Sequence, residues 1–113
     1  AFQKLVGLDM ETLNFRLEKG DRRLASQANM VGVVSSGNLE VLIESADLNG
    51  GCEVEIKTAA VGFGAIWQAV VADFHARWYL QDVRILINDA GATPAVVSLR
   101  LDQAVESVMG ATA

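Results

Sequence analysis

The chain has 113 residues, 51% of them hydrophobic, and a formal net charge of -5 at pH 7. This length and composition are typical of one domain that buries a modest core without covalent staples. The negative charge disfavours nonspecific nucleic-acid binding, which needs a cationic face, and no apolar stretch approaches the roughly 20 residues that span a bilayer.

The first nine residues, 1–9, precede Met10 and carry no clear pattern. We interpret them as an artificial leader and expect the native chain to start at Met10, so that a single domain covers 10–113. The N-terminus lacks the charged-then-apolar order of a secretory signal, and we therefore expect a soluble protein.

The first predicted strand covers residues 13–17, where Leu13, Phe15 and Leu17 alternate with polar side chains. This period of two indicates a strand with one wet face. A polar connection over 19–29 separates it from the next strand-like run.

A β-hairpin is predicted from about residue 30 to 45, because two β-prone runs flank the pair Gly37-Asn38. Glycine at the first central position satisfies the positive φ of a type II′ turn, which matches the twist of the strands. Ser36 would then sit at the hairpin tip with its hydroxyl held out, beside Ser35. Ordinary turn chemistry is a sufficient explanation of these serines on local pattern alone.

The next predicted strand follows an Asn-Gly-Gly turn at 49–51, and its apolar residues alternate with Glu53, Glu55 and Lys57. This alternation favours a solvated outer face over a general acid/base pair for the two glutamates. Cys52, the single cysteine, cannot form an internal disulfide and is typical of a small buried hydrophobe. We expect a reducing, cytoplasmic compartment.

A helix is predicted to begin at the Gly-Phe-Gly sequence 62–64 and to run to about Tyr79 or Leu80. The glycine pair lacks the third glycine of a dinucleotide loop and the Lys-Ser/Thr of a P-loop. His75, the only histidine, is interpreted as a surface residue, and both tryptophans, Trp67 and Trp78, as packing residues. The predicted buried stripe consists of Ile66, Ala69, Val70, Phe74 and Trp78.

A central strand at 83–87 precedes a loop at 88–94, and a final helix follows. Thr93 can cap this helix and Pro94 suits its first position. The loop could bind an anion at the helix N-terminus, although a glycine-dependent turn with a cap explains it equally well. The predicted buried stripe consists of Val97, Leu101, Ala104, Val105 and Val108.

These elements predict an α+β fold: a single-domain, two-layer sandwich with a mainly antiparallel β-sheet and two helices packed on one face. One histidine, one cysteine and scattered carboxylates form no nucleophile-base pair, metal spacing or cofactor cradle. We therefore expect no catalytic residues and no metal site. From the residues alone, the chain is a small α+β domain with a presentable serine.

Three segments, 31–42, 61–67 and 87–101, resemble in order and spacing the acyl carrier (delta) subunit family of bacterial malonate decarboxylase. The resemblance extends from about Leu13 to the C-terminus. The acyl carrier (gamma) subunit of citrate lyase is a related family with the same prosthetic group. It ranks second, because the Gly-Ala-Thr-Pro segment at 91–94 is more similar to the malonate decarboxylase branch.

In that family a serine in a Gly-Ser-Gly-Asp-Leu/Met-Glu-Val context carries phosphoribosyl-dephospho-coenzyme A, a phosphopantetheine-like group, through a phosphodiester. The resemblance places this covalent attachment at Ser36, with Gly37 and Asn38 as the turn, and would make the chain a phosphoprotein. The chain departs from the pattern twice. Ser35 stands where the family often has glycine and is a rival acceptor, and Asn38 stands where it often has aspartate.

The resemblance implies a non-catalytic carrier subunit in a complex that converts malonate to acetate plus carbon dioxide. An acetyl thioester on the arm would exchange with malonate, and the resulting malonyl thioester would be decarboxylated to regenerate it. The implied partners are an acyl/CoA-transferase subunit, decarboxylase subunits and a prosthetic-group transferase, with no nucleic acid and no membrane insertion.

Two alternatives come from other classes of protein. One is an unmodified assembly or adaptor subunit that uses the 88–94 loop as an interface. The other is a small hydrolase or transferase with Ser36 as nucleophile, which is disfavoured because His75 has no evident route to the hairpin tip.

Overall fold

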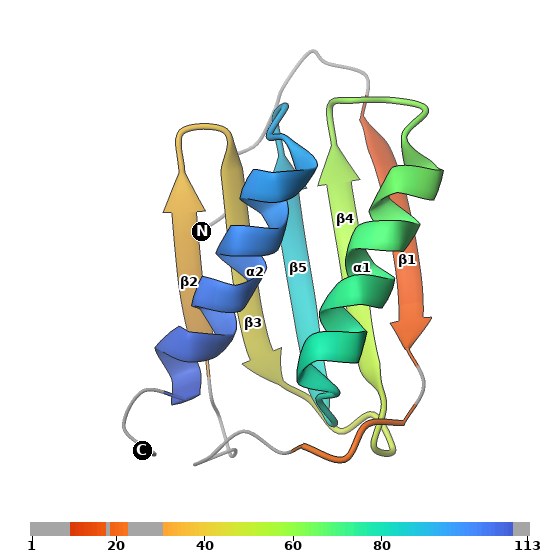
Figure 1. Ribbon diagram of the computed structural model, residues 1–113, viewed down its shortest axis with the longest axis vertical. Helices are drawn as coiled ribbons and strands as arrows, with labels where there is room; N and C mark the ends of the chain where they lie inside the picture. The colour runs from red at the N-terminus through yellow and green to blue at the C-terminus, as the bar shows by residue number, and fades with distance from the viewer. Residues whose placement is uncertain (1–9, 18, 23–30, 110–113) are drawn as a thin grey trace.

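The computed structural model describes residues 10–17, 19–22 and 31–109, so the segment 1–9 and much of the 19–29 connection lie outside the described residues. Seven elements follow one another: β1 (Glu11–Leu17), β2 (Val31–Ser36), β3 (Leu39–Ser45), β4 (Cys52–Thr58), α1 (Gly64–Trp78), β5 (Val83–Asp89) and α2 (Pro94–Met109). The strands form one sheet in the order β1-β4-β5-β3-β2 (Figure 1). Among these five described strands, the β4–β5 pair is parallel and the other pairs are antiparallel, and α1 makes the parallel crossover.

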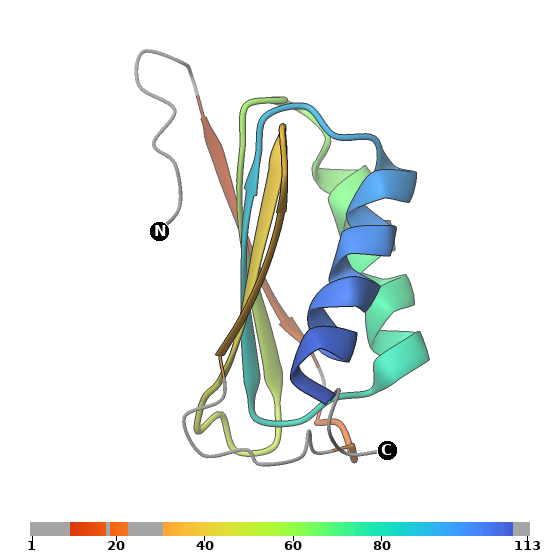
Figure 2. The same cartoon turned by 90° about the vertical axis from the view of Figure 1, so that its left-hand side faces the viewer.

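Both helices cover the same face of the sheet, and the predicted α+β sandwich is confirmed (Figure 2). Strands β3, β4 and β5 bury alternate residues against the helices, as their period of two requires. Strand β5 lies at the centre, as expected for the apolar run at 83–87. The core consists mainly of aliphatic residues from these strands, together with Trp67 and Phe74 of α1 and Val97 and Leu101 of α2.

The buried stripe of α1 differs from the prediction by a rotation of the helix. Its buried residues are Trp67, Val70, Val71 and Phe74, whereas Ile66 is 44% exposed. Each residue advances a helix by about 100°, so this orientation buries the larger Trp67 in place of Ile66. The predicted stripe of α2 is confirmed, with Val97, Leu101, Ala104 and Val105 buried and Val108 packed at its margin.

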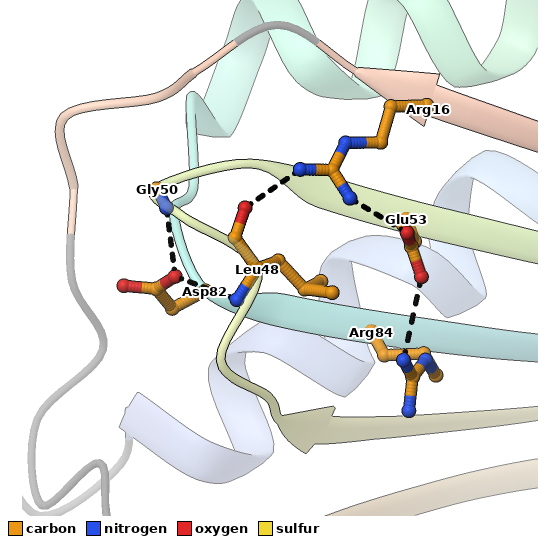
Figure 3. Close-up of polar contacts among 6 residues, drawn as sticks. All are labelled: Arg16, Leu48, Gly50, Glu53, Asp82 and Arg84. Carbon is orange, nitrogen blue, oxygen red and sulfur yellow. Dashed lines mark hydrogen bonds and ion pairs between the residues drawn. The ribbon is translucent and has the colours of Figure 1, made fainter.

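Glu53 belongs to an ion-pair cluster on the uncovered face of the sheet, as predicted for a structural carboxylate (Figure 3). Arg16 donates to Glu53 at 2.7 Å and to the carbonyl of Leu48 at 2.7 Å, and Arg84 approaches Glu53 at 3.4 Å. The hydrogen bond from Arg16 lowers the pKa of Glu53. Asp82 accepts the amides of Leu48 (3.1 Å) and Gly50 (2.9 Å). The cluster therefore holds the β3–β4 connection.

Cys52 gives a stability test that is linked to pH. Burial raises the pKa of its thiol from 9.0 to about 12, and Glu53 adds a smaller effect in the same direction. Between these values the unfolded chain loses a proton that the folded chain retains, so stability is intact below pH 9 and falls above it. We expect the free energy of unfolding to fall by about 1.4 kcal/mol per pH unit from this group.

Urea unfolding of the wild type and of Cys52→Ala at pH 8 and pH 10.5 measures this contribution. The wild type should lose more stability over that interval than the variant, because other alkaline titrations are common to both proteins. Equal losses would contradict the assignment.

Candidate functional site

The predicted hairpin has a two-residue turn, Gly37-Asn38, as expected. It closes with Ser36 directly opposite Leu39, so these two residues share one face of the sheet. The turn lies at the end of the edge strand β2 (Figure 1). Both turn residues are exposed.

The predicted type II′ geometry of this turn is wrong. Neither Gly37 nor Asn38 has a positive φ, which type I′ and II′ turns require. The turn also makes a tertiary contact, because the amide of Ala90 donates to the carbonyl of Asn38 at 2.9 Å. The turn is thus tied to the loop that follows β5. The described glycines with positive φ are Gly50, Gly62 and Gly91.

We expect Gly37→Ala to change the free energy of unfolding by less than about 0.5 kcal/mol. A Cβ at Gly37 would meet no atom within 4 Å, and its φ does not demand glycine. Gly91→Ala is the matched contrast, because its φ of +123° strains any side chain, and it should cost about 1 kcal/mol. Chemical denaturation of both variants tests this, and a large loss from Gly37→Ala would refute it.

The two serines lie on opposite faces of β2. Ser35 is exposed on the uncovered face, opposite Glu40. Ser36 is half-buried on the side of the helices, and its Oγ is buried with no hydrogen-bond partner among the described residues. The expectation of a projecting Ser36 hydroxyl is therefore wrong in this structure, because strand alternation turns it toward the helix layer. This hydroxyl nevertheless has no hydrogen bond within the described residues that a modification would break.

A buried carboxylate, which the sequence did not single out, shapes the loop beside the hairpin. Asp89 is 1% exposed and accepts three hydrogen bonds, from Thr58 Oγ1 (2.8 Å), the Ala92 amide (2.8 Å) and the Gly91 amide (3.2 Å). The sequence does contain a signal for this carboxylate: Asp89 is in phase with the buried residues of β5, and Ala-Gly follows it. The loop is therefore fixed internally. The predicted Thr93 cap is confirmed, since its Oγ1 accepts the Val96 amide at 3.3 Å.

Both helices begin at the hairpin end of the sheet. Leu39 pairs with Asp89, and Asp89 pairs with Thr58, so the loops leaving β4 and β5 start beside the hairpin and lead into α1 and α2 (Figure 1). Neither first turn contains an acidic residue, and α1 has no side-chain cap. Helix N-termini carry partial positive charge and favour anions. Carboxylates of the chain itself already lie there, since Glu11 accepts the Gly62 amide before α1 and Asp89 accepts the Gly91 and Ala92 amides before α2.

Two hollows flank the 88–94 loop. A depression of about 60 Å³ is lined by Ser36, Gly37, Asn38, Leu39, Glu40, Asn88 and Ala90. An apolar groove of about 260 Å³ lies between the first turns of α1 and α2 and is lined by Ala60, Phe63, Ile66, Trp67, Val70, Asp89, Gly91, Ala92, Pro94 and Val97.

The geometry does not assemble a serine nucleophile with a base. Ser36 Oγ and His75 Nε2 are both without hydrogen-bond partners among the described residues, so they do not contact each other. His75 lies in the last turn of α1, at the end away from the hairpin (Figure 1). Over residues 10–17, 19–22 and 31–109, no group of three potential metal ligands is found, and no helix is long and apolar enough to cross a membrane.

The described residues form a small α+β module with a serine hairpin beside the first turns of two helices. Residues 26–108 match the family model described as malonate decarboxylase delta subunit (MdcD). The chain therefore belongs to the malonate decarboxylase delta-subunit family of acyl carrier proteins.

Individual relatives agree with this family. A "Malonate decarboxylase acyl carrier protein" of Xanthomonas euvesicatoria pv. vesicatoria is 62% identical over 106 residues, covering 92% of this chain and 100% of the relative. A protein of that name from Burkholderia cepacia is 63% identical over 79 residues, covering 70% of this chain and 72% of the relative. A chain in the crystal structure of a Pseudomonas malonate decarboxylase hetero-tetramer in complex with malonate superposes with a TM-score of 0.71 at 31% identity, covering 87% of this chain and 98% of that chain.

Proposed function

We propose that this chain is the acyl carrier subunit of a malonate decarboxylase and bears a phosphoribosyl-dephospho-coenzyme A arm on Ser36. The observation that carries the proposal is the family match over residues 26–108, which includes the whole serine hairpin. When attached, the arm supplies a terminal thiol that holds an acyl group as a thioester.

The local structure fits covalent attachment at Ser36. Its Oγ has no hydrogen-bond partner among the described residues, so a phosphodiester there replaces no internal hydrogen bond. Because the hydroxyl is buried, the prosthetic-group transferase has to open the hairpin end to reach it.

Ser35 is the rival acceptor. It is exposed and therefore reachable without any opening, but it lies on the uncovered face, away from the helix layer. Glu40 is the cross-strand neighbour of Ser35 and also lines the depression at Ser36, so its charge does not discriminate between the two serines. The family pattern favours Ser36.

The carrier role assigns the chemistry to other subunits. We propose that an acyl/CoA-transferase subunit and decarboxylase subunits convert malonate to acetate plus carbon dioxide while this chain supplies a rigid base and docking faces. A tethered arm raises the effective concentration of its cargo at each partner site. The free, buried Cys52 is consistent with a cytoplasmic compartment, which we propose for the complex.

Intact mass spectrometry tests the proposal. The chain coexpressed with its prosthetic-group transferase should gain the mass of one phosphoribosyl-dephospho-coenzyme A. The chain expressed without the transferase is the control and should stay bare. Absence of the adduct when transferase activity is verified on a related carrier subunit would refute the carrier function.

A further inference from the structure

The apolar groove between α1 and α2 has a rim that the fold itself does not explain. Phe63 is 47% exposed and Ile66 is 44% exposed, and both line the groove without belonging to the buried core. Adjacent exposed apolar side chains around a hollow are typical of a ligand-binding surface. We therefore expect the groove to bind an apolar group.

The groove is next to the proposed attachment site. The loop after β5 separates the two hollows: Asn88 and Ala90 line the depression at Ser36, and Gly91 and Ala92 line the groove. The hydrogen bond from Ala90 to Asn38 holds this loop against the hairpin. An arm attached to Ser36 therefore starts on the other side of this loop from the groove.

We propose that the groove is the resting site for the distal, thiol-bearing end of the arm carried by Ser36, an inference that rests on the proposed function. The volume of about 260 Å³ is below that of a site for a drug-sized ligand, so it admits the slender distal end alone.

The lining also sets which cargo can rest there. Nine of the ten lining residues are apolar or glycine, and the tenth, Asp89, already accepts three hydrogen bonds within the loop. A free thiol or an acetyl group can be buried in this surface, whereas the carboxylate of a malonyl group would lose its hydration without a cationic partner. The groove accordingly holds neutral ends of the arm and releases anionic ones.

Tethering makes weak binding sufficient. A short flexible linker gives an effective concentration in the millimolar range, so an intrinsic dissociation constant of similar size leaves the arm bound for a large part of the time. The arm still leaves readily for a partner subunit. This balance is what a carrier requires.

NMR spectroscopy and thiol alkylation of the chain that carries the prosthetic-group arm test the inference. The Trp67 indole lines the groove, whereas Trp78 donates to Asp102 elsewhere and is an internal reference. Attachment of the arm should shift the NMR signal of the Trp67 indole and leave the signal of the Trp78 indole unchanged. The arm thiol should react with iodoacetamide about threefold more slowly than free coenzyme A. Buried Cys52 contributes little to the rate, and the bare chain corrects for it.

Two rim variants, Phe63→Ser and Ile66→Ser, should restore the alkylation rate of free coenzyme A. Leu99→Ser is the matched control, because Leu99 is 50% exposed on α2 and does not line the groove, and it should leave the protection unchanged. An acetyl-loaded chain should keep the Trp67 shift, and a malonyl-loaded chain should lose it.

The outcomes separate the two proposals. A chain that carries the arm by intact mass, yet shows an unshifted Trp67 and an unprotected thiol, would refute the groove while leaving the carrier function in place. Equal Trp67 shifts for acetyl and malonyl cargo would refute the charge selectivity. A chain that acquires no arm would refute the carrier function itself.

Discussion

We expect Ser36→Ala to abolish loading of the prosthetic group and Ser35→Ala to retain it. The Ser36 hydroxyl is the proposed acceptor, and no neighbouring hydroxyl on the helix side of β2 can replace it, since Ser35 faces the other way. The measurement is the intact mass of each variant after coexpression with the prosthetic-group transferase. The predicted change is from full loading to none.

The same variants distinguish loss of the acceptor from loss of the fold. Because Ser36 Oγ is buried without a partner among the described residues, its removal should leave the free energy of unfolding unchanged or slightly higher. Thermal unfolding of Ser36→Ala should therefore match the wild type. If Ser36→Ala is loaded and Ser35→Ala is bare, the attachment site is Ser35.

Asp89→Ala is expected to lower the free energy of unfolding by about 3 kcal/mol. The change leaves the Gly91 and Ala92 amides and the Thr58 hydroxyl without their acceptor in a position that is 1% exposed. It also frees the loop whose Ala90 amide holds the hairpin turn. Urea unfolding measures the loss of stability.

Two further variants make this prediction specific. Thr58→Val removes one of the three donors to Asp89, together with the Thr58 acceptor of the Ala60 amide, and should have a smaller effect. Asp73→Ala removes a carboxylate that is 64% exposed on α1 and should change stability by less than about 0.5 kcal/mol. An Asp89→Ala protein as stable as Asp73→Ala would show that the buried carboxylate does not hold the loop.

Much of the fold follows from local patterns in the sequence. Alternation around Leu39 and Val54 predicts strands with one buried face, the apolar run at 83–87 predicts a central strand, and the Thr93-Pro94 pair predicts where α2 begins. The sheet order is not contained in these patterns. Placing β5 between β3 and β4 depends on contacts among segments far apart in the chain.

The orientation of Ser36 could have been predicted from the hairpin itself. A two-residue turn makes Ser36 the direct partner of Leu39, and direct partners share a face, so an inward Leu39 implies an inward Ser36. The role of Asp89, by contrast, could not be predicted from the local sequence. Its partner Thr58 is 31 residues away, and only the parallel pairing of β4 with β5 brings the two side chains together.

The most direct test of the central claim is tandem mass spectrometry of this chain isolated within an active malonate decarboxylase from its native host. Cleavage after Arg23 and Glu40 releases one fragment, 24–40, that holds both serines of the hairpin. We predict a fragment that carries one phosphoribosyl-dephospho-coenzyme A on Ser36. An active complex in which this fragment is unmodified would contradict the account.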